Sequence, residues 1–150
     1  MRTIHDPTEL ERLKTRLASV TPDAHRQWGR MTPHQMICHL SDAFRFSLGE
    51  REVAPVRFPI PAPVVRVLAL RLPIPWPKGS PTAREMDQNR DGTPPGDFLE
   101  DRLALEALLD RFARTREGWP RHPIMGNMGL KDWGRWGWLH TDHHLRQFGV

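Results

Sequence analysis

The chain has 150 residues, the length of one compact domain, and 38% of them are hydrophobic. Its formal charge is +4, but the arginines are scattered among 18 acidic residues and form no dense basic cluster, so we expect no nucleic-acid partner. No apolar run reaches the roughly 20 residues of a membrane helix, and the N-terminal stretch lacks the apolar core of a signal peptide. Cys38, the single cysteine, cannot form an internal disulfide, so the sequence predicts a cytoplasmic protein with no membrane partner.

Two amphipathic helices are predicted in the first third of the chain. Residues 5–20 place leucines at helical spacing behind Asp6, a favourable N-cap. Residues 31–49 begin with Thr32, followed three positions later by Gln35, which is the capping-box pattern. Both starts therefore carry a side chain that can accept hydrogen bonds from the free N–H groups of a first turn.

Two further helices are predicted in the last third. Residues 96–119 follow the N-cap Asp97, and we expect Leu99 and Leu103 to begin their apolar stripe. The fourth helix spans residues 130–148, with an acidic residue in its first turn that favours the positive end of the helix dipole. Regular strand alternation is missing from the sequence, so helices are expected throughout.

A long connection, residues 50–96, separates the second predicted helix from the third. Eight of the 15 prolines fall between residues 55 and 81, which argues against long regular structure because proline fixes φ and removes a donor. Residues 64–72 form the one candidate for a short helix within it. A structureless loop of this length is unusual, so we expect it to pack on the bundle as a lid or an oligomer contact. The sequence thus predicts an all-α fold: a single domain, 1–150, built as a four-helix bundle with a proline-rich crossover between helices 2 and 3.

Three of the eight histidines fall on predicted apolar helix faces. His39 lies between Met36 and Leu40 in the apolar stripe of the second helix. His140 and His144 are four residues apart, so they project from one face of the last helix on successive turns. All three are therefore expected to face the core.

Buried imidazoles are costly unless both ring nitrogens have partners, and three that meet would repel one another when protonated. A divalent metal resolves this, because neutral imidazole is a common metal ligand and bundle cores build metal sites from facing helices. Two histidines at i, i+4 with a third from another helix leave coordination positions open, which is typical of a catalytic site. The alternatives are a satisfied core histidine for the first and a solvated helix face for the pair.

The stretches WGRMTPHQMICHLSDAF and LHTDHHLRQFG together resemble the DinB-like superfamily of metal-binding four-helix bundles, and most of all a branch of unknown function. The likeness runs over residues 28–149. It implies that His39, His140 and His144 bind one divalent ion, which would be zinc, nickel, iron or manganese. It also implies that His143 lies next to a ligand in the sequence, where it either supports that ligand or is exposed, and that the protein forms a homodimer.

The same resemblance implies a metal-dependent enzyme of the hydrolase or thiol-dependent S-transferase type. Its partners would be a small-molecule substrate and a low-molecular-weight thiol. The alternative is a stress-related module of the same fold that binds a metal or ligand without catalysis. The chain departs from the family in its long proline-rich crossover and in having no tyrosine, so no tyrosine can assist catalysis.

Four other residues were weighed for roles near this site. Asp42 is the candidate catalytic residue, able to orient a ligand or accept a proton, but it could equally be a surface aspartate paired loosely with Arg45. Gln147, three positions after a predicted ligand, could hydrogen-bond that ligand or a substrate, or lie at a helix-end surface. Cys38 is interpreted as a small buried residue, and Asp142 as a solvated one.

Overall fold

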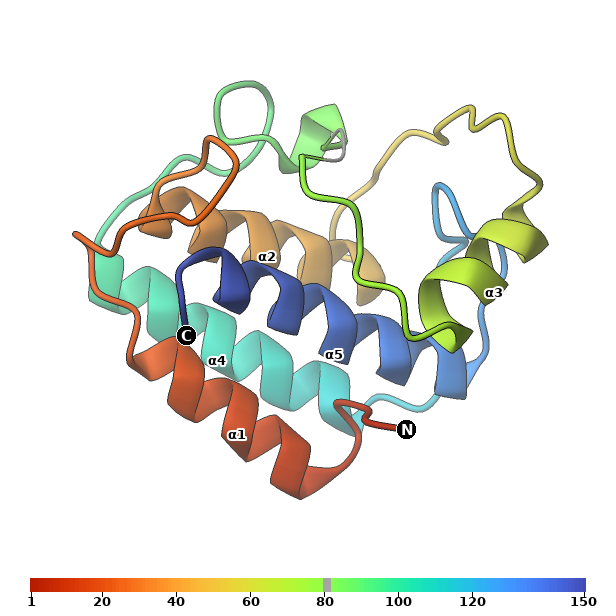
Figure 1. Cartoon of the computed structure of the whole chain (residues 1–150), viewed down its shortest axis with the longest axis horizontal. Helices are drawn as coiled ribbons and strands as arrows, with labels where there is room; N and C mark the ends of the chain where they lie inside the picture. The colour runs from red at the N-terminus through yellow and green to blue at the C-terminus, as the bar shows by residue number, and fades with distance from the viewer. Residues whose placement is uncertain (80–81) are drawn as a thin grey trace.

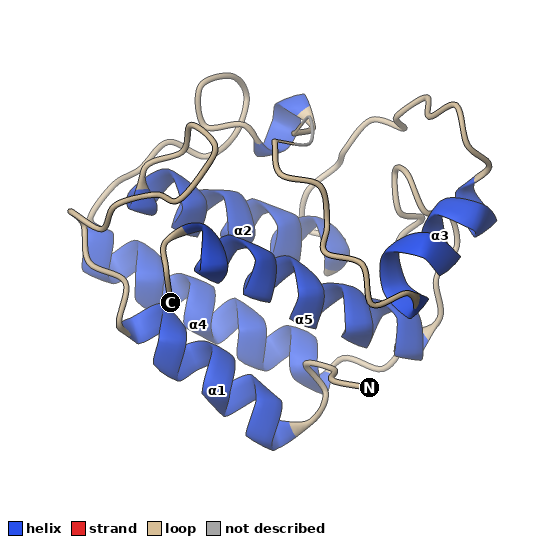
Figure 2. Ribbon diagram, viewed as in Figure 1, coloured by secondary structure: helices blue, strands red, loops and turns tan. Residues whose placement is uncertain are grey.

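The computed structural model of the chain describes residues 1–79 and 82–150, and within these ranges the protein is all-helical, with no strand (Figure 2). Ser80 and Pro81, inside the predicted crossover, lie outside the described residues. The described helices are α1 (Pro7–Ala18), α2 (Pro33–Ser47), α3 (Ala62–Arg71), the 3-10 helix η1 (Arg84–Met86), α4 (Phe98–Arg114) and α5 (Leu130–Gln147). None of them is both long enough and apolar enough to cross a membrane.

The helix starts are those that the capping residues predict. The Asp6 carboxylate accepts a hydrogen bond from a backbone N–H of the first turn of α1, and Asp97 does the same for α4. At α2 the capping box is complete: Thr32 Oγ1 accepts from the Gln35 N–H at 3.1 Å, and Gln35 Oε1 accepts from the Thr32 N–H at 3.0 Å. Each such cap stabilises its helix by about 1 kcal/mol, so the chain enters the site-bearing helix α2 at a defined residue.

The four longer helices, α1, α2, α4 and α5, pack together around one hydrophobic core (Figure 1). Helices α2 and α4 share the most extensive contact, α1 contacts both α4 and α5, and α2 also contacts α5. Each large apolar side chain in this core contributes about 1.5–3 kcal/mol through burial. The fully buried ones include Ile4, Leu13, Leu17, Met36, Phe44, Leu105, Leu109, Phe112 and Trp133.

The prediction that Leu99 and Leu103 belong to the buried stripe of α4 is wrong. They are 53% and 52% exposed. Leu108 and Phe112 of the same predicted stripe are buried, and they are joined by Leu105, Leu109 and Ala113. At about 100° per residue, Leu103 lies nearly opposite Leu105 on the helix, so burying one turns the other outward.

The crossover between α2 and α4 packs on the helices, as its length predicts. Its helix α3 lies against α5, where Arg66 and Arg71 both pair with Asp132 in the first turn of α5. The segment after α3 then crosses α5 on its way to η1, which lies against α2 (Figure 1). Arg51 fastens this end by donating to the Glu85 carbonyl at 2.8 Å. The crossover is therefore held at both helices that carry the predicted metal ligands.

Candidate metal centre

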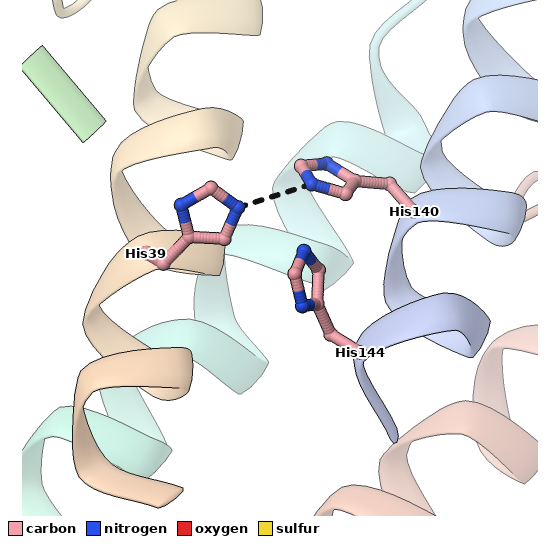
Figure 3. Close-up of side chains that lie close together, drawn as sticks. All are labelled: His39, His140 and His144. Carbon is pink, nitrogen blue, oxygen red and sulfur yellow. Dashed lines mark hydrogen bonds between the residues drawn. The ribbon is translucent and has the colours of Figure 1, made fainter. Parts of the chain in front are cut away.

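Helices α2 and α5 bring the three predicted histidines together. His39 projects from the middle of α2, and His140 and His144 face it from successive turns of α5 (Figure 3). The side chains are buried, and one nitrogen from each ring lies within 4.8 Å of the other two. His39 Nε2 and His140 Nε2 are 3.2 Å apart. The spacing of four residues thus places two imidazoles on one face, as the sequence predicts.

The crossover fixes the orientation of the His39 ring. Its Nδ1 lies 2.9 Å from the backbone carbonyl of Met86, the last residue of η1. Because a carbonyl oxygen can only accept, Nδ1 carries the proton and Nε2 is left with a free lone pair. That lone pair points toward the other two rings (Figure 3). A carbonyl that orients a histidine in this way is the usual outer partner of a metal ligand.

His144 is oriented by a side chain of its own helix. Its Nδ1 lies 3.0 Å from Oε1 of Gln147, whose Nε2 donates to the Trp28 carbonyl at 2.9 Å. The second bond decides how the amide is turned, because only the NH₂ group can donate to a carbonyl. The Gln147 oxygen therefore accepts from His144 Nδ1–H, and His144 Nε2 also keeps its lone pair for the common centre.

The remaining ring, His140, has one nitrogen without a hydrogen-bond partner among the described residues, wherever its proton lies. If His39 Nε2 accepts, His140 Nε2 must carry a proton to donate across the 3.2 Å gap. His140 Nδ1 is then a buried acceptor, and it has no hydrogen-bond partner among the described residues. Leaving a buried polar atom unpaired costs about 1–3 kcal/mol. Two nitrogens bound to one zinc at about 2.0–2.1 Å and a tetrahedral angle lie roughly 3.3–3.4 Å apart, so the observed gap fits shared coordination.

Burial keeps all three imidazoles neutral. It lowers the pKa of His39, and it lowers the pKa values of His140 and His144 well below the ordinary histidine value. The nearby rings add to the effect: His144 and His39 depress the pKa of His140, and His39 depresses that of His144. Neutral imidazole is the form that binds a metal, so binding near pH 7 needs no net loss of a proton from the rings, although at His140 the proton would move from Nε2 to Nδ1.

Tryptophan side chains pack on the α5 side of this group, against His140 and His143. The Trp136 ring centroid lies 4.9 Å from that of His140, and Trp76, from the crossover, lies 5.9 Å from it. Trp76 also packs on the half-buried His143, which makes an edge-on contact with Trp28. His143 is thus a wall of the site beside a ligand, one of the two places that the sequence analysis gives it.

A family model with the description "Protein of unknown function (DUF1569)" matches residues 6–149. The chain belongs to the DUF1569 family. The match includes every described helix, so the three histidines lie within the DUF1569 domain. Searches of curated proteins and of solved structures found no match. What this DUF1569 chain does must therefore be inferred from the chemistry of its own residues.

In this DUF1569 chain Asp42 is fully buried, so the surface alternative for it is wrong. Its Oδ2 accepts from Gln88 Nε2 at 3.1 Å and from the Thr93 N–H at 2.8 Å, and its Oδ1 accepts from Thr93 Oγ1 at 2.6 Å. Arg51 and Arg45 lie 3.2 Å and 3.5 Å from the same carboxylate. These contacts make Asp42 an anchor that ties the crossover to α2. Its catalytic role stays a prediction.

The predictions for Gln147 and Asp142 had different outcomes. Gln147 accepts a hydrogen bond from His144, and Met86, which no side-chain motif could indicate, supplies the matching partner for His39. The prediction that Asp142 is solvated is wrong, because it is buried between Arg16 at 2.8 Å and Arg146 at 2.9 Å. The arginine one turn after Asp142 on α5 was the available signal, since i, i+4 pairs of opposite charge attract.

Two further titratable groups, Cys38 and His122, are neutral at pH 7 because of burial. Cys38 is buried, as predicted, and burial raises the pKa of its thiol to about 12, so it is neutral at pH 7. His122 packs against Trp133, and its Nδ1 accepts from the N–H groups of Ile124 and Met125 at 3.1 Å each. Burial lowers the pKa of His122 to about 4. His122 thus holds the turn before α5 as a neutral acceptor.

Proposed function

We propose that this protein binds one divalent metal ion through Nε2 of His39, His140 and His144. The observation that carries the proposal is the fixed tautomer of two of the rings. Met86 and Gln147 hold Nδ1–H of His39 and His144, so that both Nε2 lone pairs face the third ring. A core that served packing alone would have no need to direct imidazole lone pairs at one another.

The proposal includes the DinB-like fold, with α1, α2, α4 and α5 as the four-helix bundle and α3 as part of the crossover. The sequence likeness and the mutual contacts of these four helices support it. We infer a homodimer from the same likeness, and a cytoplasmic location from the single cysteine. The exposed Leu99 and Leu103 of α4 supply apolar surface for such an interface, and light scattering on the purified protein tests it.

Three neutral imidazoles suit first-row transition metals, and zinc, nickel, iron and manganese are the candidates. Three protein ligands also leave at least one coordination position for water or substrate, which favours a catalytic centre over a structural one. When bound, such an ion supplies a Lewis acid that makes a water or thiol nucleophilic near neutral pH.

The reaction we infer is a hydrolysis or a thiol-dependent S-transfer on a small molecule. Trp76 and Trp136 line the centre with apolar surface and exclude bulk water from it. Lys78 lies over the ring of Trp28, which in turn contacts His143 at the edge of the site. The Lys78 ammonium can hold an acidic group of a substrate or of a low-molecular-weight thiol. The catalytic role of Asp42 as a proton acceptor is part of the same proposal.

The alternative is a stress-related module of the same fold that binds the metal or a ligand without turnover. The burial of the centre favours this alternative, because the three histidines, His39, His140 and His144, are only 5%, 9% and 8% exposed. Trp76 also packs against the rings of His140 and His143 on α5. Turnover in a panel of hydrolase and thiol-transfer substrates separates the two functions. A metal-loaded protein inactive on the whole panel would support the module.

Metal content, measured by elemental mass spectrometry on tag-free protein, is the first experiment. We expect each of His39→Ala, His140→Ala and His144→Ala to hold about one equivalent less than the wild type. The matched control is His25→Ala, because His25 is an exposed histidine outside the centre, and it keeps the metal. A wild type that stays metal-free after loading with zinc, nickel, iron and manganese in turn would overturn the metal centre.

A further inference from the structure

A second group of possible metal ligands lies between α2 and α4. His34, Cys38 and Asp101 each offer one ligand atom, and these atoms lie within 4.8 Å of one another. His34 Nε2 is 2.7 Å from Asp101 Oδ2, and Cys38 Sγ is 3.7 Å from the same oxygen. The group mixes imidazole, thiol and carboxylate, which differs from the all-imidazole centre.

This group is separate from the three-histidine centre although both use α2. Cys38 and His39 are consecutive, so they project about 100° apart around the helix. His39 faces His140 and His144 on α5, whereas His34 and Cys38 meet Asp101 on α4. One helix thus presents a donor set to each of two neighbouring helices.

The three side chains are held in place by different parts of the fold. His34 and Cys38 are one helical turn apart on the same face of α2. The His34 ring packs edge-on against Phe98 with centroids 5.3 Å apart. Asp101 Oδ2 also accepts from the Gly96 N–H at 2.9 Å, and this backbone bond holds the carboxylate in place. Positions fixed in this way lower the entropy cost of binding an ion.

We infer that His34, Cys38 and Asp101 form a second site for a thiophilic divalent ion of the zinc class. One thiolate, one carboxylate and one neutral imidazole balance the charge of a divalent ion and are all zinc ligands. Binding releases the Cys38 thiol proton to solvent, and the proton that His34 Nε2 shares with Asp101 moves to Nδ1 so that the ring stays neutral. The His34 and Asp101 side chains are 20% and 30% exposed, which gives the ion a route in and leaves a fourth position for water. Occupied, the site clamps the start of α2 to the start of α4.

Cobalt(II) titration followed by absorption tests this site without any assay of activity. A thiolate bound to cobalt gives a charge-transfer band in the near ultraviolet, and an imidazole-only site does not. Because Cys38 is the single cysteine, the band can arise at no other residue. We expect it in the reduced wild type and equally in His140→Ala, which removes a ligand of the other centre.

Three substitutions locate the band. Cys38→Ser abolishes it, and Asp101→Asn and His34→Gln each weaken cobalt binding at this site by at least about tenfold. The two latter positions are partly exposed, so they report on the site even if the buried Cys38→Ser fails to fold. The control is Asp110→Asn, a carboxylate of the same helix that pairs with Lys14 instead and leaves the titration unchanged.

Two outcomes would overturn the inference. One is a reduced wild type that shows no thiolate band at a few equivalents of cobalt. The other is a band that persists unweakened in both Asp101→Asn and His34→Gln, because Cys38 would then bind without its neighbours. Loss of metal from the three-histidine centre leaves the band intact, so failure of the proposed function and failure of this inference give different results.

Discussion

His144 Nδ1 and Gln147 Oε1 form a 3.0 Å hydrogen bond between two residues one turn apart on α5. This bond sets the ring orientation of a proposed ligand from outside the ligand set. Gln147→Leu keeps the side-chain size but cannot accept, and we expect metal affinity to fall about 10- to 100-fold. Competition with a chromogenic chelator measures the change. Gln147→Glu can still accept from Nδ1, so it should lose less affinity; equal losses in the two variants would contradict the orienting role.

Gly29 offers a test of the same hydrogen bond from the other side. A Cβ at Gly29 would lie 2.5 Å from Gln147 Nε2, so Gly29→Ala displaces the amide that holds His144. We expect metal affinity to fall about tenfold, although no ligand is altered. Gly49→Ala is the matched control: Gly49 has the same left-handed φ but no atom within 4 Å of the added Cβ. Both variants share the backbone strain, and only the first should lose metal.

Metal removal should destabilise the protein. At a free metal concentration of 100 times Kd, binding to the folded state alone adds about 2.7 kcal/mol, which for this length raises Tm by about 5 to 10 °C. Thermal unfolding with and without a chelator measures this difference. His140→Ala should unfold at the same temperature in both conditions apart from any contribution of the cysteine-containing site. A wild-type Tm unmoved by zinc would argue against a preformed centre.

Acid should destabilise the metal-free protein through His122. Burial holds the pKa of His122 at about 4 in the folded state, against an ordinary value of 6.5. The unfolded chain therefore takes up the proton first, and the free energy of unfolding falls by up to about 3 kcal/mol as pH drops from about 6.5 to 4. His122→Asn can still accept from the turn and should remove only the part of this slope that His122 contributes, because burial also lowers the pKa values of His39, His140 and His144. Urea titrations across the range measure the difference. His25→Asn, at an exposed position, should keep the wild-type slope.

The close approach of α5 to the Phe112 ring on α4 requires a glycine at position 137. A Cβ at Gly137 would lie 2.8 Å from Phe112 Cε1 and 3.1 Å from Ile4 Cγ2. Gly137→Ala therefore overpacks the core and should lower the free energy of unfolding by about 1–3 kcal/mol, despite the better helix propensity of alanine. Gly129→Ala, at the start of the same helix with open space around its Cβ, provides the comparison. A stabilised Gly137→Ala would mean that the close approach is not required.

The helix boundaries and the inward-facing histidines were predictable because they depend on local rules. Asp6, Thr32 and Asp97 act through the N–H groups of their own first turns, and the spacing of His140 and His144 fixes their common face. Gln147 was within reach of the same reasoning, being one turn from a ligand. Each of these inferences needs only a few consecutive residues.

The rest of the site depends on contacts between distant parts of the chain. Met86 reaches His39 with its backbone, and Asp42 is buried where Thr93 and Arg51 of the crossover converge on it. Leu99 is exposed because the path of the chain, rather than helical spacing alone, decides which of two apolar faces turns inward. Local periodicity carries no information about these long-range contacts or about the path of the chain.

The bond from His39 to Met86 O has a consequence for how the crossover can change. A main-chain oxygen is present whatever residue occupies position 86, so substitutions there leave the acceptor in place. Its location depends on the path of the chain between α2 and η1, which insertions and deletions alter. The crossover can therefore change its amino acids freely, but its length and course are constrained. A main-chain acceptor for a proposed metal ligand leaves no signature that a comparison of sequences could detect.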